Sequence, residues 1–218
     1  VESPLHIGNG EFLIPDFDIA RAGAPTYVVD IDQLIEQQGA DCARDFKGGD
    51  FTISDYLKDA GIHPQDVSRR SIDVDHEVKE IGDEEVREVM LDGRGIPMIP
   101  GSSLKGAIRT ALLRASFQGR KVGPSDITGF FGEEPQKDLM RAVAVRDVYL
   151  PEETTRIEEI KVLNWKKQGA EVKHFSNYVE AFPRGTEFQV EVGLNRVFLE
   201  RYADQLGWSD GKVNAVQD

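Results

Sequence analysis

The chain has 218 residues, which is enough for one large domain or two small ones with a buried core. It contains no apolar run of about 18 residues, so no part of it is expected to span a membrane. The net charge of −13 comes from residues 1–100, where 9 Lys and Arg stand against 22 Asp and Glu, because residues 101–218 hold 17 of each. Any nucleic-acid contact is therefore expected mainly in the second half.

The first hundred residues predict short strands and helices. In chain order we expect a strand at 1–7, a turn at Gly8-Asn9-Gly10, a strand at 27–29, a helix at 32–38 and a helix at 54–60 capped by Ser54. Residues 71–79 then alternate between apolar and mostly acidic side chains, which predicts a half-buried strand. Strands at 86–91 and 96–99 flank Asp92-Gly93, a good hairpin turn.

An amphipathic helix is the clearest element of the second half. Apolar side chains recur at helical spacing, and the expected N-cap is Ser102 or Ser103: the repeating residues are Leu104, Ala107, Ile108, Ala111, Leu112 and Ala115. After it we expect, in order, a turn-rich piece at 123–132, a strand near 139–150, paired strands at 156–165 and 176–182 around a polar loop, a strand at 187–194 and a helix at 197–206.

This order of elements predicts an α+β fold of the ferredoxin-like (RRM-like) kind, if a large insertion is set aside. The predicted core spans 1–10 and 96–218, and the predicted acidic insertion spans 11–95. A complete ferredoxin-like unit needs one more strand after residue 212. The chain is therefore expected to be a fragment, or to be completed by another segment.

Residues 99–110 read Ile-Pro-Gly-Ser-Ser-Leu-Lys-Gly-Ala-Ile-Arg-Thr, a pattern in which a strand ends and a helix begins. Gly101 allows a sharp turn between the two. The first amides of a helix have no partners within it, and together with the helix dipole they favour an anion. Ser102 and Ser103 can donate to phosphate oxygens where they are not used for capping.

Lys105 and Arg109 are four residues apart and so share one face of this helix. Gly106 has no side chain, which lets a sugar-phosphate backbone approach closely. The alternative is an ordinary capped helix with two exposed basic residues. The pattern is not a P-loop, which needs four residues between Gly and Gly-Lys and then Ser or Thr, so nucleotide hydrolysis is not indicated.

This stretch closely resembles the helix motif of the RAMP superfamily of type III CRISPR systems. Further segments resemble that superfamily in the same order along the chain, at 3–10, 127–132, 146–151 and 179–186. A long span separates Gly10 from Ile99. Within it, the segment Tyr-Val-Val-Asp-Ile-Asp-Gln-Leu at 27–34 resembles the fifth subunit of the Csm (type III-A) complex.

The resemblance implies a non-catalytic subunit that caps the filament holding the 3′ portion of the guide RNA. It implies the guide RNA and other Csm subunits as partners, especially a neighbouring backbone RAMP subunit. No membrane, metal or cofactor is expected. It also implies RNA contacts by Gly8 and Gly10 of the glycine-rich segment and by Ser102, Ser103, Lys105, Gly106 and Arg109.

Residues 164–175 read as a basic hairpin tip flanked by aromatic side chains. Trp165 can stack on bases, while phosphates can be neutralised by Lys166, Lys167 and Lys173. The resemblance implies that this is the superfamily's β-hairpin thumb, which wedges into the guide duplex. The alternative is a solvated loop with Trp165 packed inward.

Two other functions stay open. One is a metal-dependent ribonuclease of the same superfamily, whose backbone subunits cut target RNA with an Asp shortly before the helix motif. Here Asp92 falls in the predicted turn instead, and no clear equivalent is present. The other is a protein-interaction module whose acidic first half contacts a basic neighbour.

The remaining polar residues give weaker signals. No Cys partner lies at metal-ligand spacing from the four histidines, His6, His63, His76 and His174, and His76 is expected in the core. A metal cluster could be proposed for Asp16, Asp18, Asp30 and Asp32, although a solvated acidic face is the simpler interpretation. The single cysteine, Cys42, cannot form an internal disulfide, which fits a reducing cytoplasm.

Overall fold

The computed structural model describes residues 1–21, 25–39, 52–78, 81, 84–118, 120–151, 154–166 and 169–201, and beyond these 203, 204, 207, 208, 210, 211 and 216. The chain divides into two compact units. Unit 1 comprises Val1–Met98 and Tyr149–Glu187, and unit 2 comprises Ile99–Val148 and Phe188–Asp218. No helix in the described ranges is long and apolar enough to cross a membrane.

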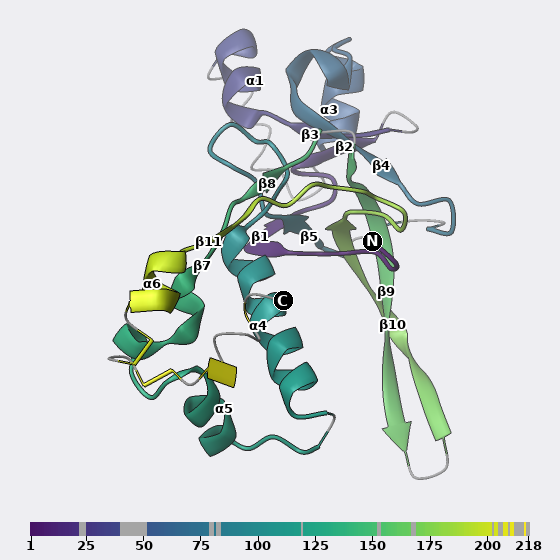
Figure 1. Cartoon of the computed structure of the whole chain (residues 1–218). Coiled ribbons are helices and arrows are strands. Elements are labelled where there is room, and N and C mark those ends of the chain that lie inside the picture. The colour runs from purple at the N-terminus through teal and green to yellow at the C-terminus, as the bar shows by residue number, and fades with distance from the viewer. Residues whose placement is uncertain are drawn as a thin grey trace. The chain divides into compact units, whose positions relative to one another are not determined.

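Unit 1 is built on one sheet of seven strands in the order β1-β5-β10-β9-β4-β3-β2 (Figure 1). The strands are β1 (Gly8–Leu13), β2 (Ile19–Arg21), β3 (Thr26–Val29), β4 (Ser68–Val74), β5 (Val86–Val89), β9 (Arg156–Lys166) and β10 (Gly169–Ala181). The pairs β5–β10 and β4–β9 are parallel, and the other neighbours are antiparallel. Strands from the first hundred residues therefore flank the β9–β10 hairpin on both sides.

Two clusters of buried apolar side chains hold unit 1 together. One lies on the sheet and includes Leu13, Val28, Ile72, Val86 and Ile157. The other lies between strands β2 and β3 and three short helical elements, α1 (Ile31–Gln38), α3 (Ile53–Asp59) and the 3-10 turn η1 (Pro64–Val67). This second cluster includes Leu34, Ile53, Leu57 and Val67. The strand predicted at 27–29 and the helices predicted at 32–38 and 54–60 are present, each within about two residues. The predicted cap at Ser54 is wrong, because Thr52 is the N-cap of α3 and accepts from the Asp55 N–H.

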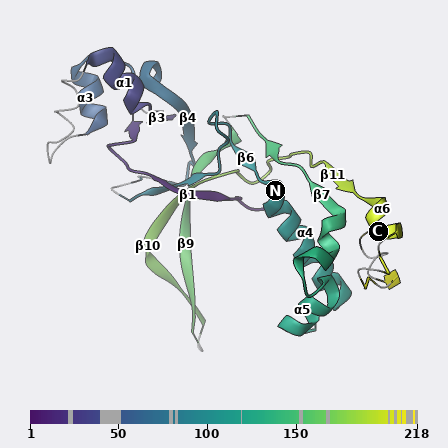
Figure 2. The same cartoon turned by 90° about the vertical axis from the view of Figure 1, so that its left-hand side faces the viewer.

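Unit 2 is mainly helical (Figure 2). Its elements are α4 (Gly101–Ser116), α5 (Pro124–Phe131), η2 (Pro135–Lys137), η3 (Leu139–Ala142), β7 (Val143–Val145), β11 (Val192–Leu194) and α6 (Arg196–Arg201). β7 and β11 pair antiparallel. The core includes Phe131, Leu139, Leu199 and Trp208, with Ile108 and Leu112 of α4 packed against it. The short strands β6 (Met98–Ile99) and β8 (Val148–Tyr149) pair with each other and contain two of the points where the chain passes between the units.

The strand predicted at 1–7 and the turn predicted at Gly8-Asn9-Gly10 are wrong, because these glycines lie inside strand β1. The pairing of β1 with β5 shifts register between Gly8 and Phe12, and Gly10 has a φ of 93°. Glycine provides the conformational freedom that an irregular strand of this kind needs. The same residues in sequence suggest a reversal of the chain.

Residues 123–132, predicted to be turn-rich, instead contain helix α5. Pro124 stands at its first turn, where the missing N–H is tolerated, and Asp126 Oδ2 accepts from the Gly123 N–H over 2.9 Å. Tertiary packing of Phe131, which is fully buried, outweighs the turn propensity of the glycines.

The strand predicted at 71–79 begins earlier and ends at Val74. The side chain of His76 beyond this end is 83% exposed, so the prediction of a core histidine is wrong. The strand predicted at 187–194 is reduced to β11, and Val192 within it is 53% exposed. Alternation of apolar residues therefore does not mark a buried face in this segment.

The predicted division into a core (1–10 and 96–218) and an acidic insertion (11–95) remains a proposal about domain organisation. In the structure, strands from both parts share the sheet of unit 1. What the sequence suggests to be an elaboration therefore supplies β2, β3, β4 and β5 of that sheet.

Candidate nucleic-acid interface

The start of helix α4 is fixed by a close approach of two backbone segments. A Cβ on Gly101 would lie 2.2 Å from the carbonyl oxygen of Val145, so only glycine fits there. The Gly101 N–H donates to Asp147 Oδ1 over 2.7 Å. A carboxylate thus already occupies the first amide of the helix, which leaves less of this N-terminus for an incoming phosphate.

Small residues line the exposed face of α4. The N-cap is Pro100 and makes no side-chain capping bond, so the predicted capping by Ser102 or Ser103 is wrong. Both serines are exposed in the first turn. Gly106 is also exposed, and nothing lies within 4 Å of the position that its Cβ would take. A sugar-phosphate backbone could approach this face without displacing a side chain.

The two basic residues predicted to share a face of α4 have different environments. Arg109 Nη1 donates to Asp138 Oδ2 over 2.6 Å, and its guanidinium lies 3.9 Å from the ring centroid of Phe131. Lys105 is half-buried and forms no ion pair with any residue that the structure describes. Arg109 is therefore largely engaged in holding unit 2 together, and Lys105 is the cation of this pair that remains for a phosphate.

The surroundings of α4 in sequence are basic. No Asp or Glu lies between Asp92 and Asp126, a segment that holds Arg94, Lys105, Arg109, Arg114, Arg120 and Lys121. The whole chain has a net charge of −13. Helix α4 is therefore a locally basic element in an acidic protein.

The β9–β10 hairpin continues beyond the sheet of unit 1 as a two-stranded arm (Figures 1 and 2). Its register pairs Arg156 with Ala181 at the base and Lys166 with Gly169 at the tip, with an irregularity between Val172 and Ser176. The predicted pairing of these strands is confirmed. The strands also run through most of the segment expected to be a loop.

Side chains near the tip of the arm are largely exposed. Trp165 is 79% exposed, so the alternative in which it packs inward is wrong. Leu163 and Val172, which pair across the strands, are 54% and 48% exposed. Trp165 shares their face because side chains alternate along a strand. This end of the arm presents an apolar and aromatic surface.

The basic residues of the arm are only partly free. Lys166 forms an ion pair with Glu171, and Lys173 Nζ lies 5.8 Å from the ring centroid of Phe175. These four residues, with Asn164 and Val172, line an open hollow on the arm. Lys167 lies outside the described residues, so its role remains a prediction.

Gly8 and Gly10 lie within strand β1 of unit 1 and not in the predicted turn. They line a cavity of about 290 Å³ together with His6, Glu11, Phe12, Arg87 and Glu88. Those predicted RNA-binding residues that the structure describes thus fall on three elements, namely β1 and the arm in unit 1 and α4 in unit 2.

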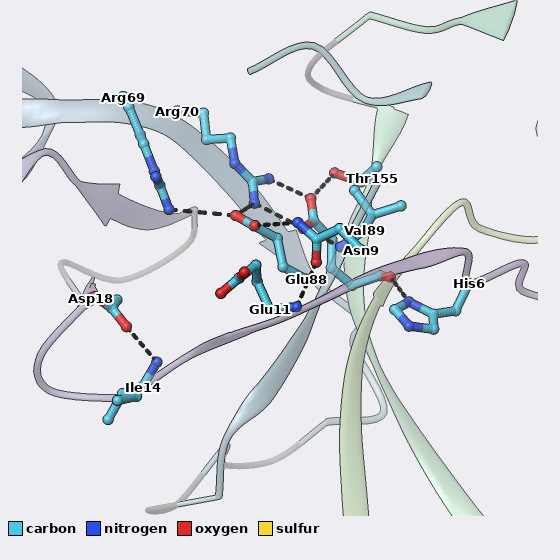
Figure 3. Close-up of polar contacts among 11 residues, drawn as sticks. His6, Asn9, Glu11, Ile14, Asp18, Arg69, Arg70, Glu88, Val89 and Thr155 are labelled. Carbon is cyan, nitrogen blue, oxygen red and sulfur yellow. Dashed lines mark hydrogen bonds and ion pairs between the residues drawn. The ribbon is translucent and has the colours of Figure 1, made fainter. Parts of the chain in front are cut away.

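Beside this cavity lies a buried network of charges (Figure 3). Arg70 on β4 donates to both carboxylate oxygens of Glu180 on β10, and its Nη2 lies 2.9 Å from Glu180 Oε2 and 2.9 Å from Glu88 Oε1. Thr155 Oγ1 and the Val89 N–H also donate to Glu180, over 2.7 and 3.2 Å. Although burial disfavours the charge, the hydrogen bonds and charges of Glu180 and Glu88 raise the pKa of Arg70.

Sequence reasoning missed this network. One signal in the sequence could have indicated it: Arg70 lies two residues before the apolar Ile72, a spacing that places both on the same face of a strand. In the structure both side chains are buried on that face of β4. A charged residue two positions before a core residue of a strand is a candidate for an internal ion pair.

Three of the acidic residues considered for metal binding or catalysis, Asp18, Asp30 and Asp92, have structural partners instead. Asp18 and Asp30 accept from the backbone N–H groups of Ile14 and Gln33. Asp92 accepts from the N–H groups of Ile96 and Arg94, which lowers the pKa of its carboxyl. Within the described ranges, no three His, Cys, Asp or Glu side chains are placed to hold a metal ion.

The sequence profile of the RAMP superfamily matches residues 1–211. The CRISPR system Cms endoribonuclease Csm3 of Methanocaldococcus jannaschii is 32% identical over 125 residues, which cover 49% of this chain and 50% of that protein. The CRISPR system Cms protein Csm5 of Streptococcus thermophilus is 24% identical over 234 aligned positions, which cover 94% of this chain and 65% of that protein. The chain thus spans between half and two thirds of these relatives.

Solved structures share the mixed α/β fold. The crystal structure of Csm5 from T. onnurineus matches with a TM-score of 0.74 at 24% identity, covering 94% of this chain and 69% of that one. A chain of the cryo-EM structure of a Csm-crRNA-target RNA ternary complex, from a type III-A CRISPR-Cas system, matches with a TM-score of 0.72 at 23% identity, covering 94% and 65%.

Proposed function

The chain belongs to the RAMP superfamily, and from this membership we propose that it is a non-catalytic, guide-RNA-binding subunit of a Csm (type III-A) effector complex. We place it at the end of the complex that holds the 3′ portion of the guide. Its proposed partners are the crRNA and other Csm subunits, above all a neighbouring backbone subunit. The similarity to Csm5 of Streptococcus thermophilus along 94% of the chain supports this assignment.

The open face of α4 is the observation that carries the proposal. It combines exposed Ser102, Ser103 and Gly106 with Lys105, in a segment free of acidic residues. Phosphate contacts of this kind position a nucleic acid without reading its sequence. The exposed aromatic face of the arm adds a surface on which bases can stack. Gly8 and Gly10 of β1 remain proposed contacts. Arg109 also remains one, and its binding to a phosphate would require its ion pair with Asp138 to open.

We also retain as a proposal that a ferredoxin-like core, interrupted between its first strand and first helix, underlies the fold. The order of β1, α4, β9 and β10 along the chain supports it.

Substitution of Lys105 by Ala tests the proposal. We expect weaker binding of single-stranded RNA and a salt dependence reduced by a slope of roughly 0.7, the value for one lost phosphate contact. Lys58, an exposed lysine on α3, offers a matched control, and Lys58→Ala should leave both quantities unchanged. Fluorescence anisotropy with labelled RNA at several salt concentrations provides the measurement. Equal affinities and slopes for Lys105→Ala and the native chain would contradict the proposal.

A target-RNA-cleaving subunit is the second candidate, because the relative from M. jannaschii is named an endoribonuclease and is 32% identical over 125 residues. Asp92 is the residue to test, since it precedes the helix. Its hydrogen bonds within the turn leave it little freedom to act as a base. RNA cleavage in Mg²⁺ or Mn²⁺ that disappears in an Asp92→Asn chain would favour this candidate over the scaffold.

A further inference from the structure

We infer that Arg70 is a positioning residue, which fixes the β9–β10 arm relative to the glycine-rich strand β1. The inference rests on the proposed function, because it gives Arg70 the task of holding two RNA-contacting elements of unit 1 in one geometry. The network that carries it is shown in Figure 3.

On one side, the network holds the base of the arm. Glu180 is the last residue but one of β10 and is fully buried, and Arg70 is 5% exposed. Thr155, directly before β9, donates to the same carboxylate over 2.7 Å. Both strands of the arm therefore enter the sheet beside one ion pair.

On the other side, the network reaches β1. Glu88 accepts from Arg70 through Oε1 and from Asn9 Nδ2 through Oε2, the latter over 3.0 Å. Asn9 lies between the two glycines of β1. Arg70 is thus two hydrogen bonds away from the glycine-rich strand.

A second link joins the same two elements. His6, just before β1, has its Nδ1 2.7 Å from the backbone carbonyl oxygen of Glu180. A carbonyl oxygen only accepts, so Nδ1 carries the proton in this contact. The arm residue that binds Arg70 therefore also anchors the entry to β1.

The chemistry of the network favours a positional role over a purely stabilising one. The pairing of β4 with β9 begins at Asp73, three residues after Arg70, and neither β10 nor β5 is a neighbour of β4 in the sheet. The Arg70 side chain therefore joins β4 to two strands, β10 through Glu180 and β5 through Glu88, with which β4 does not pair. A planar guanidinium holds two carboxylates at fixed angles, which a lysine ammonium does not. Apolar residues of similar volume often stabilise a core as well as or better than a buried ion pair, so the ion pair's distinctive property is geometric specificity.

The neighbouring residue provides an internal control. The side chain of Arg69 is 50% exposed, and its Nη2 reaches Glu88 Oε1 only at 3.4 Å, with no bond to Glu180 among the described contacts. It carries the same charge on the same strand. If the inference is right, only Arg70 governs the arm.

Pulsed electron paramagnetic resonance tests this directly. Spin labels at Glu11→Cys on β1 and Val162→Cys on the arm, in a Cys42→Ser background, report the distance between the two elements. Arg70→Lys keeps the charge but loses the planar contacts, and Glu180→Gln keeps the shape but loses the charge. We expect both to broaden the distance distribution and to weaken RNA binding about fivefold, which corresponds to roughly 1 kcal/mol, whereas Arg69→Gln should change neither.

Unchanged distance distributions in folded Arg70→Lys and Glu180→Gln chains would overturn the inference, and so would equal broadening by Arg69→Gln. If Arg70→Lys does not fold, the isosteric Glu180→Gln chain decides the matter. The distances are measured without RNA. Absence of RNA binding by the native chain even at low salt would therefore count against the proposed function, while the positioning role is judged on the distances alone.

Discussion

Two requirements conflict at Gly106 of helix α4. Glycine inside a helix lowers stability relative to alanine by roughly 0.5–1 kcal/mol. Nothing in the structure lies near its absent Cβ, so packing does not require glycine at this exposed position. A close approach by an RNA backbone would explain it.

We therefore expect Gly106→Ala to raise the free energy of unfolding by about 0.5–1 kcal/mol and to weaken RNA binding. Urea denaturation gives the free energy of unfolding, and fluorescence anisotropy with labelled RNA on the same preparation gives the affinity. Gly101→Ala is the contrasting variant, because its Cβ would collide with the Val145 carbonyl oxygen and should destabilise the fold. A Gly106→Ala chain that is more stable and binds RNA normally would remove this face from the interface.

Arg109 illustrates how a residue can share a helix face with Lys105 and still have a different role. Its ion pair with Asp138 and its contact with Phe131 are both partly shielded from solvent. We expect Arg109→Met to lower the free energy of unfolding by about 1–2 kcal/mol, mainly through the lost cation–π contact and hydrogen bond. Arg114→Met, at an exposed position of the same helix, should change it far less, as thermal denaturation of both chains would reveal.

At the scale of elements, the arm makes the most specific prediction. Trp165 is 79% exposed and Trp208 only 3%, so the two tryptophans differ in access to solvent. Trp165→Phe should abolish most of the quenching of tryptophan fluorescence by acrylamide without changing stability. Replacement by alanine should weaken RNA binding by roughly 1–3 kcal/mol, the range for one stacked base. Quenching that persists in Trp165→Phe would show that the arm is not exposed as described.

The junction of β4 and β9 makes stability depend on pH. The Glu77 N–H, together with the hydrogen bond from Arg156, lowers the pKa of Asp75. A lowered pKa means that Asp75 contributes stability above its unfolded-state pKa of about 3.9 and loses it as the pH falls further. Asp75→Asn should thus be less stable than the native chain at pH 6, with the difference shrinking toward pH 3 in urea denaturation. A constant difference would contradict the assignment.

Sequence patterns predicted well the helix over 104–115, whose apolar stripe places Ile108 and Leu112 against the core of unit 2. They also predicted the paired strands of the β9–β10 hairpin, although most of β9 is exposed. The patterns failed where tertiary contacts decide the local structure, as at the glycines of β1 and in helix α5. Of the interface, the α4 residues and Trp165 could be identified from sequence. The Arg70 network could not, because its partners are joined only by the sheet order.

At the scale of the molecule, charge is distributed unevenly between the units. Unit 2 holds 11 Lys and Arg against 10 Asp and Glu, whereas unit 1 holds 15 against 29. The net negative charge of unit 1 therefore repels a polyanion. At physiological salt this repulsion extends over a Debye length of about 8 Å from the surface. Partner proteins that cover acidic surface would remove this penalty.

The isolated chain should accordingly bind RNA weakly at physiological salt and much more strongly inside an assembled complex. Filter binding with the isolated chain, the full complex and the complex lacking this subunit makes the comparison. Tight binding by the isolated chain, independent of RNA length, would show that neighbours are not needed.

The exposure of the arm also bears on how its sequence can change over generations. Residues near its tip bury little apolar surface within the chain, so substitutions there cost little folding free energy. Selection removes variants mainly when their stability falls below the level that function needs. A substitution at Gly101, where a Cβ would collide with the Val145 carbonyl oxygen, lowers stability directly, whereas the tip is constrained only by what it touches. The arm is thus the part of unit 1 where recognition can diverge while the fold stays the same.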